Sequence, residues 1–283
     1  MKFQEIRSAT AIVTFGGVRF LVDPWLGDKG SIPPIPGSPN PDLRCPVSDL
    51  PLPLDEILDV DAVIATHLHF DHFDETAMEK IPKSMVIFVQ DKIDGETLLA
   101  KGFQDVRILK YAGVEFKGVQ LTKTDCLHGQ PGNIGLLYEK MELRSSACGV
   151  VMRHPAEEKT LYLVGDTIWC DYVKAALDSF KPDVIVVNAA AATIRGFGRI
   201  IMDLEDVQAV LDHAPHAVVI ASHMDNVGHE TLWRKDLRSY IRQHHLENRL
   251  LVPNDEKIRI TTLRQHHLEN RLLVPEDGEI CQF

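Results

Sequence analysis

The chain has 283 residues, of which 45% are hydrophobic and 25% are charged, an ordinary globular balance that excludes a disordered or low-complexity chain. The formal net charge is -11 at pH 7, which disfavours nucleic-acid partners, because proteins that bind phosphate backbones usually present a basic face. The five cysteines are an odd number without C-x-x-C spacing, so neither a disulfide framework nor a thiolate zinc site is expected. The chain starts without the apolar stretch of a signal peptide, and no apolar run reaches the roughly 18 residues that span a bilayer, so we expect a cytoplasmic protein without a membrane partner.

The first half of the chain is rich in predicted strands. Two β-rich runs on either side of Gly16-Gly17 predict a hairpin over residues 11–23. The proline-rich stretch from Ile32 to Pro53 predicts an irregular surface loop. Short apolar runs then alternate with helical patterns. Strands are expected at residues 62–65, 84–89, 106–109, 114–116, 119–122, 135–138, 150–153 and 160–164, with a helix between Asp91 and Lys101.

The second half alternates helices with strongly apolar strands. Helices are expected at residues 171–180, 203–213 and 230–245, and strands at 184–187 and 217–220. Asp203 is the predicted N-cap of its helix, because acidic residues follow it in the first turn. Many strands with helices between and after them predict two sheets covered by helices. No linker divides residues 1–283 into separate domains.

One segment near the end of the chain occurs twice. Residues 242–253 recur without change at residues 264–275. Two copies are too few for a solenoid, which needs about three repeats or more, and they indicate a recent tandem duplication or a cloning artefact. Each copy predicts a helix end and a short strand, at Leu250–Val252 and at Leu272–Val274. Only one strand fills a given place in a sheet, so the other copy must pack elsewhere, hang loose, or exchange with a neighbouring molecule in a homo-oligomer.

The strongest chemical signal follows the predicted strand at residues 62–65. Three imidazoles and one carboxylate fall within six residues, at His67, His69, Asp71 and His72. Alternate spacing in an extended segment lets two rings point the same way, and imidazole nitrogen and carboxylate oxygen suit zinc, manganese or iron(II). A solvated loop with scattered histidines is the simpler alternative, but clustered His and Asp side chains are typical of a metal site.

Four ligands rarely complete a site for two metal ions, so further ligands are expected downstream. His128 opens a loop that contains glycine and proline, and Asp166 and His223 each come just after an apolar strand. Sites in α/β proteins collect at the carboxyl ends of strands. Each residue alone would more often be a cap or a turn residue, whereas the three together with the early cluster indicate one shared site.

Together these residues resemble the metallo-β-lactamase superfamily of metal-dependent hydrolases. The resemblance spans residues 11 to about 240, and within the superfamily the chain is most similar to the branch that includes the ascorbate-6-phosphate lactonases. The matched features are Val22-Asp23-Pro24, the H-x-H-x-D-H run, His128, Gly165-Asp166-Thr167 and Ser222-His223.

The resemblance implies an α+β fold, a four-layer αββα sandwich with two divalent ions at one rim between the sheets. Zinc or manganese is expected and iron less so; a set of nitrogen and oxygen ligands permits harder metals such as manganese. Asp23 would orient a ligand from outside the site. Position 166 carries aspartate where some β-lactamases carry cysteine, which favours a hydrolase of the wider superfamily. The implied ligand sets are His67, His69 and His128 for one ion and Asp71, His72 and His223 for the second, with Asp166 as the bridge.

The implied function is hydrolysis of a small-molecule ester, lactone or phosphoester. Two ions would activate a shared water as the nucleophile and polarise the bond that it attacks. Asp71 would hold this nucleophile or carry its proton. His229 is a second catalytic candidate, as a hydrogen-bond donor to the substrate; the alternative is that it caps the helix that begins near Glu230. Arg195 and Arg199 lie in a loop where a guanidinium could clamp a carboxylate or phosphate, and solvated loop arginines are the simpler interpretation.

Three other functions stay open at this point. A nuclease or phosphodiesterase of the same superfamily is opposed by the acidic charge and by the lack of a basic and aromatic stripe. A non-catalytic metal-binding member is opposed by the presence of a full set of ligands. A redox di-iron enzyme is opposed by the absence of room for the flavin or rhodanese domain that such proteins usually carry.

Overall fold

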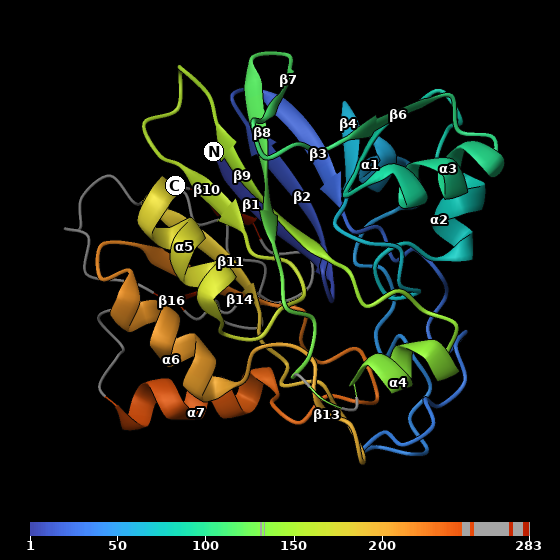
Figure 1. The fold of residues 1–283 in the computed structure, drawn as a ribbon, viewed down its shortest axis with the longest axis vertical. Helices are drawn as coiled ribbons and strands as arrows, with labels where there is room; N and C mark the ends of the chain where they lie inside the picture. The colour runs from blue at the N-terminus through green and yellow to red at the C-terminus, as the bar shows by residue number, and fades with distance from the viewer. Residues whose placement is uncertain (131, 133, 245–249, 252–271, 274–279, 283) are drawn as a thin grey trace.

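Two β-sheets lie face to face, and helices cover the outer face of each (Figure 1). This arrangement is seen in a computed structural model that describes residues 1–130, 132, 134–244, 250–251, 272–273 and 280–282. It is the four-layer αββα sandwich that the sequence predicts, and the α+β fold class is therefore confirmed.

The first sheet contains seven strands in the order β17-β1-β2-β3-β4-β5-β6. The predicted hairpin is present as β2 and β3, which pair from Phe15 and Val18 outward. The pairings from β3 to β6 are parallel, because helices cross over between these strands. The elements of this half are β1 (Lys2–Arg7), β2 (Thr10–Phe15), β3 (Val18–Val22), α1 (Leu54–Leu58), β4 (Ala62–Ala65), α2 (Glu75–Lys80), β5 (Val86–Val89), α3 (Lys92–Ala100), β6 (Asp105–Ile108) and β17 (Ile280–Gln282).

The second sheet contains eight strands in the order β15-β16-β14-β11-β10-β9-β8-β7. A small separate hairpin is formed by β12 and β13. The elements of this half are β7 (Val114–Phe116), β8 (Val119–Asp125), α4 (Ile134–Lys140), β9 (Cys148–Arg153), β10 (Leu161–Leu163), α5 (Asp171–Phe180), β11 (Val184–Asn188), β12 (Thr193–Ile194), β13 (Gly198–Arg199), α6 (Leu204–His213), β14 (Val218–Ser222), α7 (Arg234–Gln243), β15 (Leu250–Leu251) and β16 (Leu272–Leu273).

Three apolar clusters hold the four layers together. Phe20 and Val186 belong to the cluster between the two sheets. Leu98 of α3 packs in the cluster on the outer face of the first sheet, and Val207 of α6 and Leu237 of α7 pack on the outer face of the second. Removal of this apolar surface from water is what drives the layers together, at about 25 cal/mol per Å².

The strands are directed so that polar loops meet at one rim. In the second sheet β10, β11 and β14 are parallel, and β8 runs the same way as β10, since β9 is antiparallel to both. The loops after β4 of the first sheet and after β8, β10 and β14 of the second sheet therefore gather at the carboxyl ends of these strands. This topology brings together the segments that carry the predicted ligands.

One predicted strand is wrong. Residues 135–138 lie in the helix α4, whose buried side chains are Ile134, Leu137 and Tyr138. Their spacing is that of one helix face, and a run of four apolar residues is too short to distinguish a strand from a buried helix by pattern. The short helices α1 and α2 and the strand β1 were not predicted. The predicted cap is confirmed, because the Asp203 side chain accepts a hydrogen bond from the Asp206 amide at the start of α6.

Both copies of the duplicated segment contribute a strand to the second sheet. β15 from the first copy and β16 from the second copy pair in parallel, and β16 also pairs with β14. The second copy therefore takes the place beside β14, and the first copy extends the sheet outward. Val252 and Val274, the predicted ends of these strands, lie outside the described residues.

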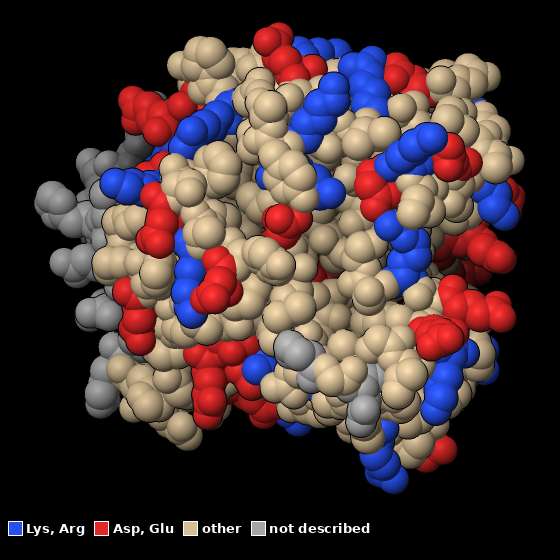
Figure 2. Space-filling view, viewed as in Figure 1, with Lys and Arg blue, Asp and Glu red and all other residues tan. Residues whose placement is uncertain are grey.

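The surface seen in Figure 2 carries Lys and Arg side chains interspersed with Asp and Glu, and they do not merge into one basic field. In the ranges that the structure describes, no helix combines the length and the apolar character needed to cross a bilayer.

Candidate metal centre

The seven predicted ligand side chains converge at the rim where the strand ends of both sheets meet. Four of them follow β4 of the first sheet, and three follow β8, β10 and β14 of the second. All are buried, and the most accessible, His69, is 8% exposed. The seven are His67, His69, Asp71, His72, His128, Asp166 and His223.

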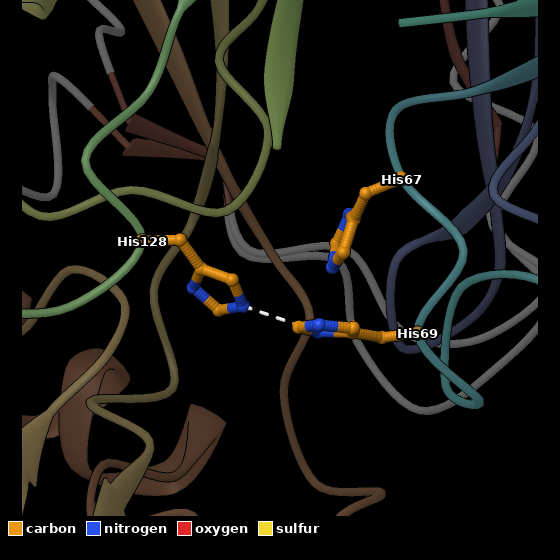
Figure 3. Close-up of side chains that lie close together, drawn as sticks. All are labelled: His67, His69 and His128. Carbon is orange, nitrogen blue, oxygen red and sulfur yellow. Dashed lines mark hydrogen bonds between the residues drawn. The ribbon is translucent and has the colours of Figure 1, made fainter. Parts of the chain in front are cut away.

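The side chains form three groups of three, each shared between the two sheets; the group of His67, His72 and Asp166 joins the two triads described next. In Figure 3, His67 and His69 from the loop after β4 point toward His128 from the loop after β8. Within each triad the ligand atoms lie within 4.8 Å of one another. These groupings are the two ligand sets that the family resemblance implied. The second triad consists of Asp71, His72 and His223.

Asp166 lies between the two triads. Its Oδ2 atom is 3.2 Å from His72 Nε2, 3.5 Å from His128 Nε2 and 3.9 Å from His67 Nε2. Its other oxygen accepts a 2.6 Å hydrogen bond from Asn188 Nδ2 at the end of β11. One carboxylate oxygen thus faces nitrogens of both triads, as a bridging ligand would.

The donor set fits a divalent cation. His72 Nε2 and His223 Nε2 are 3.2 Å apart, and His69 Nδ1 and His128 Nε2 are 3.3 Å apart. His67 Nε2 is buried and has no hydrogen-bond partner among the described residues. Nitrogen lone pairs that converge in this way repel one another unless a proton or a cation lies between them, and a buried polar atom without a partner is unfavourable. Bound divalent ions, shared among these side chains, would satisfy the five nitrogens.

The ring of His72 is oriented from outside the cluster. Its Nδ1 atom donates to Asp23 Oδ2 over 2.9 Å, which leaves Nε2 free to face Asp166. Asp23 is itself fixed by Thr66, whose amide and hydroxyl donate over 2.7 Å each. This geometry places Asp23 in the supporting position that the resemblance implied for it, and such outer contacts set the tautomer of a ligating imidazole.

Two other imidazoles are oriented by backbone carbonyls. His69 Nε2 donates to the carbonyl of Arg144 over 2.7 Å, and His128 Nδ1 donates to the carbonyl of Ile200 over 3.0 Å. Tyr138 of α4 adds a further contact, because its ring stacks on His69 and its hydroxyl donates to the carbonyl of His128. Sequence reasoning missed these residues: a carbonyl has no side-chain signature, and α4 was misread as a strand.

The electrostatics favour a bound cation as well. Burial lowers the pKa of His69 to about 4 and moves that of His67 well below its ordinary value. Burial acts to raise the pKa of Asp166, but the nearby imidazoles of His72 and His223 outweigh it and hold this pKa well below the usual range. His72 has a raised pKa despite its burial, because two carboxylates face it. An entering cation therefore meets neutral rings at His67 and His69 and an ionised carboxylate, and it must displace the protons that the raised pKa values of His72 and His223 favour.

Three of the eight described residues other than glycine that have a positive φ lie in the segments that carry the site. Asp23, His223 and Asp225 have φ values of 43°, 61° and 67°. Such left-handed conformations of residues other than glycine cost about 1–3 kcal/mol each, and they cluster at functional sites. At His223, the left-handed conformation turns the side chain toward the second triad.

A cavity opens beside the cluster, with an empty volume of about 410 Å³ that includes its mouth. His229 lies on its wall, and the Nδ1 atom of that ring is buried without a partner in the part of the chain that the structure describes. His229 does not cap α7, which begins at Arg234. The lining residues are Ile35, His69, Phe70, Asp71, His128, Leu137, Tyr138, Met141, Leu143, Asp166, Ile194, Ile200 and His229.

The two loop arginines of the sequence analysis do not line this cavity. Arg199 is instead engaged by Asp203 and Asp206 at the start of α6. A substrate clamp at Arg199 would require both ion pairs to break.

Glu230, the residue after His229, has a buried carboxyl whose pKa predicts a pH dependence of the stability. It is 1% exposed, and burial raises its pKa from 4.5 to about 8, although the amides of Asn226 and Val227 donate to it and act in the opposite direction. The folded state favours the protonated carboxyl, so its contribution to stability is complete below about pH 4.5 and is lost as the pH rises through about 8.

We expect Glu230→Gln to remove this loss, because glutamine cannot ionise and keeps the oxygen that accepts both amides. Urea unfolding of the native and variant proteins, both with chelator, measures the difference. The free energy of unfolding of Glu230→Gln should rise relative to the native protein between pH 6 and pH 9. If the free energies of unfolding of the two proteins change in parallel with pH over this range, the raised pKa of Glu230 is contradicted.

Known proteins share this fold and much of this sequence. A family model described as a beta-lactamase superfamily domain matches residues 18–224. The UPF0173 protein YddR of Bacillus subtilis (strain 168) is 40% identical over 256 residues, which cover 90% of this chain and 98% of that protein.

Two solved structures are similar over the whole chain. The crystal structure of an isothiocyanate hydrolase from Delia radicum gut bacteria has a TM-score of 0.86 and 36% identity, and covers 100% of this chain and 99% of that one. A possible metal-dependent hydrolase from Veillonella parvula DSM 2008 has a TM-score of 0.86 and 38% identity, with the same coverage of 100% and 99%.

Proposed function

The chain belongs to the metallo-β-lactamase superfamily and is a metal-dependent hydrolase, and on this basis we propose that it hydrolyses a small, uncharged carbon electrophile at a centre of two divalent ions. The observation that carries the proposal is the pair of buried triads joined by Asp166, beside a cavity with apolar walls. Zinc and manganese both suit a set of nitrogen and oxygen donors.

The ligand roles in this proposal follow the triads. Divalent ions held in this way supply Lewis-acid activation of water and of the bond under attack. One ion would be held by His67, His69 and His128 and the other by Asp71, His72 and His223, with Asp166 shared between them.

Two side chains of the cavity act on the reactants. Burial acts to raise the pKa of Asp71, but its contact with His223 and the nearby imidazoles outweigh it and keep this carboxylate ionised, so Asp71 accepts a hydrogen bond from the attacking water and orients it. Burial lowers the pKa of His229 to about 4, so its ring is neutral at pH 7. From the cavity wall the neutral ring donates a hydrogen bond to the substrate.

The cavity walls define the class of substrate. Apart from the titratable cluster, the described lining is apolar or aromatic, and it includes neither lysine nor arginine. A phosphate or carboxylate bound there would have only the metal ions as cationic partners, because no lysine or arginine lines the cavity to neutralise the rest of its charge. These walls support a neutral substrate with an apolar substituent, such as an ester, a lactone or an isothiocyanate, and they count against the phosphoester and the nuclease alternatives.

An isothiocyanate is the first substrate to test, because the relative with 36% identity is an isothiocyanate hydrolase. The group is neutral and has an electrophilic carbon between nitrogen and sulfur. Water adds through its oxygen to this carbon, and both of its protons end on the nitrogen. The carbon–nitrogen bond breaks, so R–N=C=S and H₂O give R–NH₂ and COS.

The test compares neutral and anionic substrates on protein loaded with zinc or manganese. Benzyl isothiocyanate, phenyl acetate and γ-butyrolactone are the neutral probes, and 4-nitrophenyl phosphate is the anionic probe. We expect kcat/KM for the best neutral probe to exceed that for the phosphate by about 100-fold or more, because the apolar walls supply no side-chain cation for the charge that the metal ions leave unneutralised. Protein stripped of metal is the control. A faster reaction with the phosphate would overturn the proposed substrate class.

A further inference from the structure

We propose that Arg144 and Arg199 are positioning residues, which hold the two backbone carbonyls that orient His69 and His128. The inference rests on the proposed function, since both histidines belong to the triad assigned to one metal ion. It assigns a role to two arginines that are not among the residues lining the cavity.

The first arginine acts on the ring of His69. The carbonyl that accepts the His69 Nε2 proton, at 2.7 Å, is that of Arg144 itself. The Arg144 guanidinium binds Asp91 through both terminal nitrogens, at 3.1 and 2.6 Å, and also pairs with Asp94. Asp94 is in turn fixed by a 2.7 Å hydrogen bond from Gln90. The segment that follows α4 is thus anchored to the start of α3.

The second arginine acts on the ring of His128 in the same way. The carbonyl that accepts the His128 Nδ1 proton, at 3.0 Å, belongs to Ile200, the residue directly after Arg199. Arg199 Nε lies 3.1 Å from Asp203 Oδ2, and its Nη1 pairs with Asp206. The segment that follows β13 is thus anchored to the start of α6.

The two anchors share one design. In each, the arginine binds two aspartates three residues apart, and the first aspartate is the N-cap of a helix. Asp91 caps the amides of α3, and Asp203 caps α6. A helix N-terminus holds a carboxylate firmly through its free amides and its dipole, and a guanidinium binds carboxylates through a rigid fork. Each flexible loop is therefore tied to a rigid element close to its ligand.

The consequence for the metal site is geometric. A carbonyl that accepts one ring proton fixes both the tautomer and the tilt of the imidazole. If the arginine is lost, the carbonyl can move, and the ligand nitrogen then spends part of its time away from the position that a metal requires. Loss of outer contacts of this kind typically weakens metal affinity by about 10–100-fold.

The experiment compares Arg144→Met and Arg199→Met with a matched control, Arg107→Met. Arg107 forms a bidentate pair with Asp105 on β6, at 2.8 Å for both contacts, and neither residue lines the cavity. Methionine keeps much of the side-chain bulk. Zinc affinity is measured on the full chain by competition with a chromogenic chelator, and the visible spectrum of the cobalt-loaded protein reports the ligand geometry.

We expect one of the bound zinc ions to dissociate about 10–100-fold more readily from Arg144→Met and from Arg199→Met. The cobalt spectrum should change in both variants, while Arg107→Met stays within about twofold of the native affinity with an unchanged spectrum. A purely structural role would lower the melting temperature of the metal-free protein without moving the cobalt spectrum, and that result would overturn the proposal.

A second pair of variants covers the case in which an arginine variant fails to fold. Asp91→Asn/Asp94→Asn and Asp203→Asn/Asp206→Asn remove the charge, while asparagine still serves as an N-cap. Each should reproduce the weaker zinc binding of its arginine variant. If these variants, or both arginine variants, bind zinc with native affinity, the proposed role of the two arginines is overturned and the proposed function is not affected. A native chain that binds no zinc, manganese or cobalt would overturn the proposed function and the anchors with it.

Discussion

Asp71→Ala is expected to lower kcat/KM by about a thousandfold or more while the protein stays folded. Asp71 is 5% exposed, lines the cavity, and lies with its Oδ2 atom 3.5 Å from His223 Nε2. Alanine removes both a ligand of the second triad and the acceptor that orients the attacking water. Initial rates with the best neutral substrate measure the loss, and the circular dichroism spectrum checks the fold.

A matched control for this prediction is Asp178→Ala. Asp178 also pairs with a histidine, at 2.9 Å from His213 Nε2, but its side chain is 71% exposed and lies outside the cavity. That variant should keep native activity. His229→Ala should fall between the two, with a loss of about 10–100-fold, because it removes one hydrogen bond to the substrate. An Asp71→Ala enzyme with undiminished activity would refute the assigned role of the carboxylate.

Removal of metal is expected to abolish activity and to lower the melting temperature by roughly 5–10 °C. A ligand present at 100 times its dissociation constant stabilises the folded state by about 2.7 kcal/mol. The converging nitrogens of the ion-free centre account for the direction of the change, since they lose the cation between them. Dialysis against a chelator, calorimetry, and then restoration with zinc or manganese form the experiment.

The affinity for the restored metal ion should also depend on pH. His72 holds a proton in the ion-free protein, because burial is outweighed by the carboxylates that face it and its pKa is raised. Binding of an ion must release this proton, so metal affinity should fall as the pH is lowered. Full activity in protein that retains less than about a tenth of an ion per chain would contradict a metal-dependent reaction.

The clustering of the candidate ligands could be predicted from sequence because their signal is local. His67, His69, Asp71 and His72 are adjacent in the chain, and the later ligands follow short apolar runs that are recognisable as strands. Parallel strands bring such residues to one edge of a sheet, and the structure does so. Two sheets covered by helices were predictable for a related reason, since most strands have the length and β-branching of buried strands, and the resemblance to the superfamily implied their arrangement as an αββα sandwich.

What could not be predicted depends on contacts between distant segments. The helix α4 differs from the predicted strand because its apolar run is too short to distinguish a helix from a strand, and the packing that decides it, such as that of Tyr138 on His69, comes from a distant segment. The carbonyls of Arg144 and Ile200 act through backbone atoms that every residue has. The apolar character of the cavity arises from side chains of several loops, and only their packing shows that no cation is among the described residues around it.

Both triads are shared between the two sheets. Catalysis therefore requires that the two sheets stay packed against each other. Each triad takes two members from the first sheet and one from the second. A fragment that contains only one sheet therefore lacks at least one residue of each triad. Inactivation on heating should therefore be all-or-none, in step with separation of the sheets. Substitutions at Phe20 or Val186, deep between the layers, should appear as lost metal affinity although neither residue is a ligand.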